Sequence, residues 1–237
     1  MVTEKEKDYY IKNMPGMMNQ FDEYSVTAKN VLVKYFDDSK ADELIANARK
    51  KYEKLIPQLP FIGGNENVMT SFLAGSIPDL AIFRVLEEEG VEFREIGKLS
   101  YDLVEHQNTI EALGGAGEQI FQEGYLNMLK HVAKESQLRR YPGDWVLEYV
   151  EGDGETFDYG YDVTECGIYK FFKEQGAEHL VPFICLGDYA TARASGYGFK
   201  RTQTLANGAL VCDFRFIEGG DTPRGWPPEN LEEYKKK

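Results

Sequence analysis

The cysteines are the residues whose type and spacing could carry chemistry. Three occur in the chain, at Cys166, Cys185 and Cys212, and all three lie in its C-terminal half. Their spacing, C-x18-C-x26-C, contains no C-x-x-C pair and differs from zinc-ribbon and ferredoxin patterns. Thiolates gathered at one place would bind a Zn-like divalent metal well. Two other interpretations stay open: Cys166 at a helix N-terminus would act as a nucleophile, or the cysteines are small buried hydrophobic residues.

Three carboxylates stand close to these cysteines along the chain. Glu165 precedes Cys166, Asp188 follows Cys185 by three residues, and Asp213 follows Cys212. A carboxylate beside a reactive centre can move protons, so we take these three as candidate general acids or bases. The ordinary alternative is a solvated surface group or a helix cap, and Asp188 after a glycine fits an N-cap.

Other polar side chains could bind a substrate. Arg201 and Arg215 lie on the two strands of a predicted hairpin, where a guanidinium could clamp a substrate carboxylate through two hydrogen bonds. A cross-strand ion pair is the common alternative. Thr204 shares a strand face with Thr202. Asn65 lies in a Gly-Gly-Asn-Glu-Asn turn that either lets the backbone approach an anion at the next helix N-terminus or simply joins two helices.

Helices are predicted for the N-terminal half. Residues 1–24 read as an irregular arm, and residues 25–140 show helical periodicity. Apolar residues recur at steps of three and four behind a predicted N-cap at Ser39; they are Ala41, Leu44, Ile45, Ala48, Tyr52 and Leu55. Pro78 divides the following apolar series into two helices, and Gly90 ends it.

The pattern changes at Tyr141. Residues 145–150 and 157–163 read as strands joined in a hairpin, and residues 167–175 as a short helix. A second hairpin is predicted over residues 199–217 with a tight turn at Asn207-Gly208. We expect the tail, residues 219–237, to wrap the surface or fray.

The predicted fold class is therefore α+β, with a helical N-terminal half packed on a small antiparallel sheet of two hairpins with helices between them. The predicted regions are an arm (1–24), a helical region (25–140), an α+β region carrying the cysteines (141–218) and a tail (219–237), with 25–218 forming one structural unit.

Composition narrows the function classes. The 27 Lys and Arg stand against 40 Asp and Glu, a net charge of −13, which disfavours binding to phosphate backbones. No apolar run is expected to span a membrane, and no secretory signal is visible, so we expect a cytoplasmic protein. The sequence contains no G-x-S-x-G elbow, P-loop or dinucleotide fingerprint.

Several motifs together resemble one family. They are Tyr161-Asp162-Val163-Thr164-Glu165-Cys166, Phe171 to Gly176, Cys185 with Asp188, Arg201 to Gly208, and Cys212-Asp213-Phe214-Arg215-Phe216, with Leu59 to Asn65 fitting as well. Over roughly residues 25–217 the chain is similar to the L-2-amino-thiazoline-4-carboxylic acid hydrolase family. The resemblance implies a hydrolase that opens a small cyclic amidine carrying a carboxylate. Water adds to the C=N carbon, and the ring opens to a carbamoyl cysteine.

The resemblance places the family's shared positions at Cys166, Cys185, Asp188, Cys212, Asp213 and Phe214. Two mechanisms fit them. In the first, which we favour because three cysteines exceed what a nucleophile needs, the cysteines hold a Zn-like metal that activates water while Asp188 or Glu165 moves protons. In the second, Cys166 attacks the carbon directly. Arg201 would hold the substrate carboxylate, with Thr204, Tyr161 and Asn65 as further substrate contacts and Asp213 as another acid or base.

Two alternatives stay open. One is hydrolytic ring opening of a different cyclic substrate, such as a lactam or a cyclic diketone. The other is a non-catalytic domain that binds a small molecule or metal, since the C-terminal half also resembles small-molecule-sensing domains of the 4-vinyl-reductase type. The expected partner is a small-molecule substrate, with neither nucleic acid nor membrane, and a homo-oligomer is a reasonable expectation.

Overall fold

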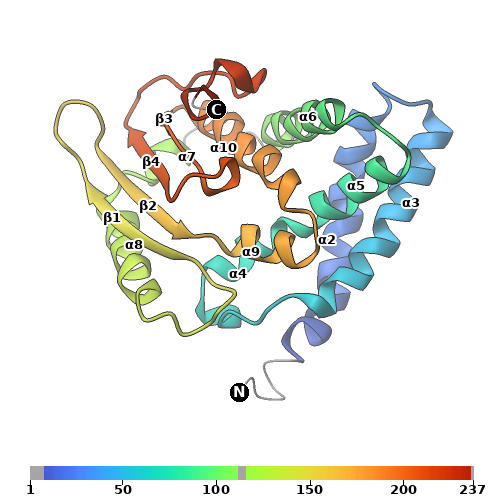
Figure 1. The fold of residues 1–237 in the computed structure, drawn as a ribbon, viewed down its shortest axis with the longest axis horizontal. Coiled ribbons are helices and arrows are strands. Elements are labelled where there is room, and N and C mark those ends of the chain that lie inside the picture. The colour runs from blue at the N-terminus through green and yellow to red at the C-terminus, as the bar shows by residue number, and fades with distance from the viewer. Residues whose placement is uncertain (1–7, 112–115, 236–237) are drawn as a thin grey trace.

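A computed structural model describes residues 8–111 and 116–235 (Figure 1). Helices make up the N-terminal half, and a four-stranded antiparallel sheet with two further helices makes up most of the remainder. The helices are α2 (Tyr9–Leu32), α3 (Asp38–Leu55), α4 (Met69–Gly75), α5 (Ile77–Glu88), α6 (Phe93–Glu111), α7 (Ala116–Gln119), α8 (Glu123–Ser136), α9 (Gly167–Glu174) and α10 (Val181–Ser195). The strands are β1 (Val146–Glu151), β2 (Tyr159–Glu165), β3 (Gly198–Lys200) and β4 (Cys212–Ile217). The predicted α+β class is confirmed.

The described part of the predicted N-terminal arm is a helix, so the irregular interpretation of these residues was wrong. Helix α2 contains Pro15 and Gly16, two residues that disfavour a helix interior. Its buried residues nevertheless repeat at helical spacing, among them Tyr10, Met17 and Phe21. Packing of this stripe against α3 therefore outweighs the local propensity.

Helix α3 has the apolar stripe that its sequence predicts, with Ala41, Leu44 and Tyr52 almost fully buried. Its N-cap is Asp37 rather than the predicted Ser39. The carboxylate of Asp37 accepts a hydrogen bond from the backbone N–H of Lys40 at 2.9 Å. An aspartate accepts at this position as well as a serine does, so the pattern was right and the position was two residues off.

Pro78 separates α4 from α5 as predicted, and it lies in the first turn of α5. The segment Met69–Glu88, which combines the two helices, is long and apolar enough to cross a membrane by composition, contrary to the expectation from sequence. In the structure 61% of the most apolar 18-residue window of this segment is buried inside the protein. Its apolar residues include Leu80, Phe83 and Leu86, which form the centre of the core, so packing against α3 and α6 accounts for the composition.

The sheet has the order β1-β2-β4-β3, so the two predicted hairpins meet through β2 and β4. Tyr161 pairs with Phe214, and Val163 pairs with Cys212. Because side chains alternate across a strand, these residues share one face of the sheet, and Asp162, Asp213 and Arg215 share the other. We call the first the inner face, since it turns toward α8 and α10, and the second the outer face.

The second hairpin is wider than predicted. Strands β3 and β4 pair, but residues 201–211 leave the sheet and form a loop that contains a short 3₁₀ helix, Leu205–Asn207. Gly208 ends this turn with φ of 86°. Asn207-Gly208 therefore closes a 3₁₀ turn instead of a two-residue hairpin, which corrects the prediction.

The C-terminal tail wraps the protein as far as it is described. Leu231 is buried, the hydroxyl of Tyr234 donates to the carbonyl of Pro182 at 3.3 Å, and the hydroxyl of Thr222 donates to the carbonyl of Tyr197 at 2.6 Å. The described part of the tail ends beside α10, on the upper side of the molecule in Figure 1.

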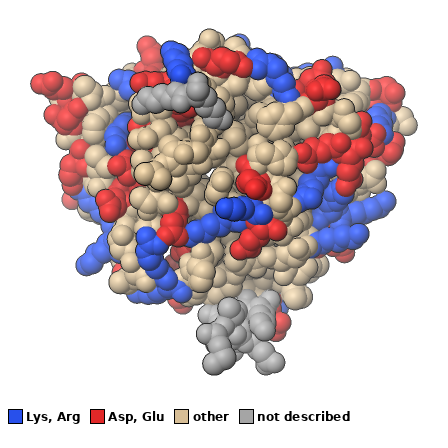
Figure 2. Space-filling model, viewed as in Figure 1, with Lys and Arg blue, Asp and Glu red and all other residues tan. Residues whose placement is uncertain are grey.

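Surface charges of both signs are interspersed on the face shown in Figure 2. On α3, for example, Lys40 pairs with Glu89 at 2.6 Å and Lys51 with Glu88 at 2.6 Å. Such exposed pairs contribute little to stability, and they leave the negative charge excess spread over the surface.

Candidate functional site

The three thiols come from three different elements and meet at the inner face of the sheet. Cys166 is the N-cap of α9, and its sulfur accepts a hydrogen bond from the backbone N–H of Tyr169 at 3.5 Å. Cys185 lies on α10, and Cys212 begins β4. The sulfur of Cys212 accepts from the backbone N–H of Leu205 at 3.1 Å. The negative charge that Cys166 or Cys212 would carry as a thiolate raises the pKa of Cys185, so the thiols lie within electrostatic reach of one another.

Enclosure keeps these thiols protonated. Burial raises the pKa of Cys212 to about 12 and that of Cys185 well above its usual range. Burial also raises the pKa of Cys166, although hydrogen bonds from backbone N–H groups at the start of α9 oppose it. A neutral thiol is a weak nucleophile and a weak metal ligand.

The arrangement of donors bears on the predicted metal. Across residues 8–111 and 116–235, no three His, Cys, Asp or Glu side chains are placed to hold a metal ion together. The three protonated thiols therefore do not form a ready coordination site in the described part of the chain.

Asp188 is the predicted carboxylate that lies close to the thiols. It lies inside α10, one turn after Cys185, so it is not the helix N-cap that the sequence also allowed. Residues three apart on a helix share a face. The negative charge of Asp188 raises the pKa of Cys166, Cys185 and Tyr161. Its side chain keeps 43% of its surface exposed, while the protein around it raises the pKa of the carboxyl itself.

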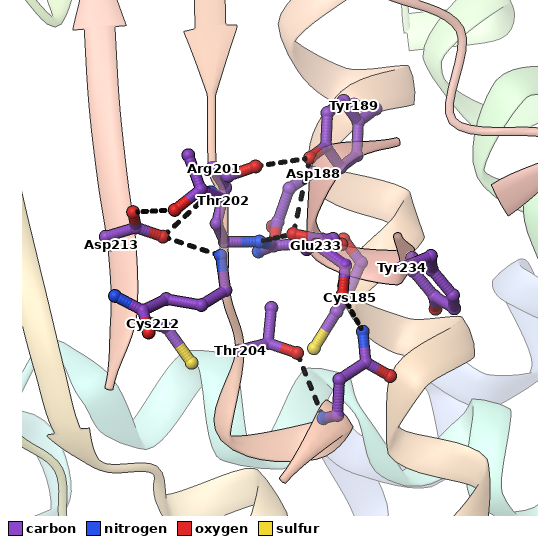
Figure 3. A network of polar contacts seen from close by, with 12 residues as sticks. Cys185, Asp188, Tyr189, Arg201, Thr202, Thr204, Cys212, Asp213, Glu233 and Tyr234 are labelled. Atoms are coloured by element: carbon purple, nitrogen blue, oxygen red, sulfur yellow. Dashed lines mark hydrogen bonds and ion pairs between the residues drawn. The ribbon is translucent and has the colours of Figure 1, made fainter. Parts of the chain in front are cut away.

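Arg201 holds Asp188 in place from the loop after β3 (Figure 3). Its side chain is fully buried, and its Nη1 donates to Asp188 Oδ2 at 2.6 Å. Its Nη2 donates to the carbonyl of Cys185 at 2.8 Å and to Glu233 at 3.1 Å, and its Nε donates to Glu233 at 2.6 Å. Four of the five N–H groups of a guanidinium are therefore occupied. These contacts make Arg201 a positioning residue, and the predicted clamp on a substrate carboxylate is left with one free N–H.

Glu233 was not predicted as a site residue from the sequence. It comes from the tail, its side chain is fully buried, and both of its oxygens accept from Arg201. It lies 32 residues from Arg201 in an acidic, lysine-ended segment that looks like solvated surface. No local sequence pattern distinguishes it, whereas in the structure the burial of Leu231 and the hydrogen bond from Tyr234 to Pro182 show that this segment docks.

Asp213 and Glu165 are both engaged by other side chains or backbone groups. Asp213 points away from Cys212, because adjacent strand residues lie on opposite faces, whereas Glu165 shares the face of Val163 at the end of β2. Glu165 pairs with Arg139 and Lys170 instead. Asp213 accepts three hydrogen bonds that tie the loop after β3, from the N–H and hydroxyl of Thr202 at 2.9 and 2.6 Å and from the N–H of Gln203 at 2.9 Å (Figure 3). Both carboxylates therefore stabilise local structure through these contacts, and the structure does not place either of them beside Asp188.

The predicted substrate contacts divide in the same way. Tyr161 lies on the inner face, stacked on Phe214 with ring centres 4.7 Å apart. Thr204 is fully buried, and its hydroxyl caps the 3₁₀ turn by accepting from the N–H of Asn207 at 3.1 Å. Asn65 lines a separate groove of about 890 Å³ between α2 and α4, where it accepts from the hydroxyl of Tyr9 at 2.6 Å.

Comparison with known proteins gives one match. The family model described as L-2-amino-thiazoline-4-carboxylic acid hydrolase matches residues 77–216. No curated protein and no solved structure matches the chain. The matched span runs from the start of α5 into β4, so it includes the three thiols, Asp188 and Arg201, whereas Glu233 lies beyond it.

Proposed function

The chain belongs to this hydrolase family, and from that premise we propose that it opens a small cyclic amidine, such as a thiazoline carboxylate, by adding water to the C=N carbon. The observation that carries the proposal is Asp188. It is a partly exposed carboxylate that a buried arginine orients beside three thiols on the inner face. A hydrolase needs a base at the point where water attacks, and this carboxylate supplies one.

The chemistry follows from the contacts. A carboxylate accepts charge-assisted hydrogen bonds from the N–H groups of an amidine. Water then attacks the C=N carbon, and its proton passes to Asp188. A ring bond to that carbon breaks, Asp188 returns the proton to the leaving ring atom, and the second water proton moves from oxygen to the remaining nitrogen as the carbonyl forms, so the product is the substrate plus one water. Because burial raises the pKa of Asp188, the carboxylate is a stronger base than an ordinary aspartate.

The aromatic surroundings support a flat ligand. Tyr161 and Phe214 stack on the inner face, and the charge of Asp188 reaches both Tyr161 and Tyr197. Planar heterocycles pack against such rings. The neutral thiols in the same place can donate weak hydrogen bonds to a ligand. The alternative mechanism is direct attack by Cys166 on the C=N carbon.

The test is an assay of product formation with 2-amino-thiazoline-4-carboxylate, followed by mass spectrometry for the gain of one water. The variant Asp188→Asn should lose about 10²- to 10⁴-fold in kcat/KM. The matched control is Asp162→Asn, which removes a partly exposed carboxylate paired with an arginine on the outer face and should keep wild-type activity. Full activity of a folded Asp188→Asn variant would overturn the role of this carboxylate.

The alternative mechanisms and functions each predict a different experimental result. Cys166→Ser abolishes activity only if the thiol attacks the substrate. A metal held by Cys166, Cys185 and Cys212 would need these side chains to rearrange into a coordination site, and it predicts one metal per chain that Cys185→Ser loses. Lactams and cyclic diketones in the same assay test a different substrate, and a ligand retained without product indicates a binding domain.

A further inference from the structure

The polar cluster at the inner face contains one cation and two carboxylates. Arg201 and Glu233 are both fully buried, and two hydrogen bonds join them. Asp188 has only one hydrogen bond to Arg201 and keeps 43% of its side-chain surface exposed. A two-point contact between arginine and carboxylate is the stronger arrangement, so Glu233 is the main counter-charge of Arg201.

We propose that Glu233 determines the specificity of the site for a cationic ligand. Because Arg201 pairs with both Glu233 and Asp188, the cluster keeps one net negative charge, and it attracts a protonated amidine or guanidine rather than a carboxylate. This inference deepens the proposed function and rests on it for the position of the substrate at Asp188.

The groups around Asp188 leave the negative charge unbalanced. Arg201 is the cation that acts on its pKa. The other titratable groups facing it are the thiols Cys166, Cys185 and Cys212 and the phenols Tyr161, Tyr189 and Tyr197, and the raised pKa of each keeps it neutral near pH 7. A ligand cation would therefore supply the missing charge, and in a partly enclosed place such a pair is stronger than in water.

Glu233 also lies outside the span that the family model matches, residues 77–216. The tail that carries it is fixed at several points. The backbone N–H of Gly225 donates to the hydroxyl of Tyr101 at 3.0 Å, and the side-chain amide of Asn207 donates to the carbonyl of Glu233 at 3.5 Å. The tail thus holds this carboxylate in one position, as a specificity-determining element needs.

Binding rather than turnover is the direct test. The probes are 2-aminothiazoline, a cyclic amidine without a carboxylate, and thiazolidine-4-carboxylate at a pH where its ring nitrogen is unprotonated. Calorimetry on the full chain compares the wild type with Glu233→Gln, which keeps the shape but removes the charge. Asp188 then becomes the only counter-charge of Arg201. We expect Glu233→Gln to weaken amidine binding at least about tenfold and to leave carboxylate binding equal or tighter.

A control and a second variant keep the test decisive. Glu229→Gln removes a tail glutamate that pairs with Arg94 on the surface and should bind the amidine as the wild type does. Glu233→Asp keeps the negative charge beside Arg201 on a shorter side chain, so it should retain amidine binding within a few fold, even where Glu233→Gln does not fold.

The outcomes separate the two proposals. Unchanged amidine affinity in folded Glu233→Gln, or its loss in folded Glu233→Asp, overturns the role of Glu233. A wild type that binds the amidine tightly and converts neither it nor the thiazoline carboxylate sinks the hydrolase proposal while the charge argument stands.

Discussion

Arg201 and Arg215 belong to the same hairpin and contact the same types of residue, yet they differ sharply in burial. Each pairs with an aspartate, at 2.6 Å for Arg201 with Asp188 and 2.7 Å for Arg215 with Asp162. Each guanidinium also lies over an aromatic ring. Arg201 is fully buried at the inner face and has a second carboxylate, whereas Arg215 keeps 23% of its side chain exposed on the outer face.

The difference teaches that the face of the sheet, not the residue type, determines how much an ion pair contributes to stability and orientation. A buried guanidinium that loses a partner leaves an unpaired charge in a poorly solvated place, whereas water replaces the partner of an exposed one. The inner face can therefore hold a carboxylate in a fixed orientation for chemistry. The outer face mainly keeps the sheet solvated.

The largest expected effect is on stability at the inner face. Replacing Arg201 by Met leaves Glu233 buried without its cation and should lower the free energy of unfolding by about 3–5 kcal/mol. Replacing Arg215 by Met should cost about 1 kcal/mol or less. Urea unfolding monitored by circular dichroism measures both. Equal losses in the two variants would contradict the distinction between the faces.

Thiol reactivity gives the next largest contrast. The thiolate is the reactive form, and burial raises the pKa of Cys212 to about 12. We expect Cys166, Cys185 and Cys212 to react with iodoacetamide at pH 8 at least about a hundredfold more slowly than an exposed cysteine of ordinary pKa. Their rates should climb as the pH rises, because ionisation begins only above the range of an ordinary thiol.

An exposed reference thiol can be placed on the outer face. Thr164 is exposed on β2, so the variant Thr164→Cys supplies a matched comparison in the same protein. Peptide-resolved mass spectrometry reads all four rates in one sample. A native cysteine that reacts as fast as the T164C thiol would show that its thiol is ionised, and would favour Cys166 as a nucleophile or the cysteines as metal ligands.

A moderate effect is expected where the outer face supports the inner one. Asp213 ties Thr202 and Gln203 through three hydrogen bonds, and the same loop carries Arg201. Asp213→Asn replaces one carboxylate oxygen by a donor and should cost about 1–2 kcal/mol. If Asp213 only positions the loop, kcat should fall modestly and its pH profile should keep its shape. A shifted profile would instead make Asp213 an acid or base, as the sequence suggested.

The sequence predicted the elements well because they follow from local patterns. The stripe of α3 and the division at Pro78 are confirmed, since each depends on residues within a few turns of one another. Helix α2 was missed because Pro15 and Gly16 hide its periodicity, which only its packing partners support.

The site was predicted in part, and the periodicity of each element explains which part. Distance along the chain from Cys185 predicted that Asp188 lies beside it, and the structure brings the two together because three residues on a helix bring side chains to one face. The same criterion placed Glu165 and Asp213 with the thiols. Asp213 points to the other face, because one step along a strand reverses the side chain, and Glu165 pairs with Arg139 and Lys170. Glu233 could not be predicted, since its partner is distant in sequence and its segment looks exposed.

The smallest effect tests whether the outer ion pair responds to salt while the inner one does not. A double-mutant cycle on Arg215 and Asp162 should give a coupling of about 1 kcal/mol or less, and 1 M NaCl should reduce it further because exposed charges are screened. The cycle on Arg201 and Glu233 should give a larger coupling that salt leaves unchanged, since both side chains are fully buried. A salt-sensitive inner coupling would mean that water reaches Arg201, and Asp188 would then lack the fixed, poorly solvated partner on which its role as a base depends.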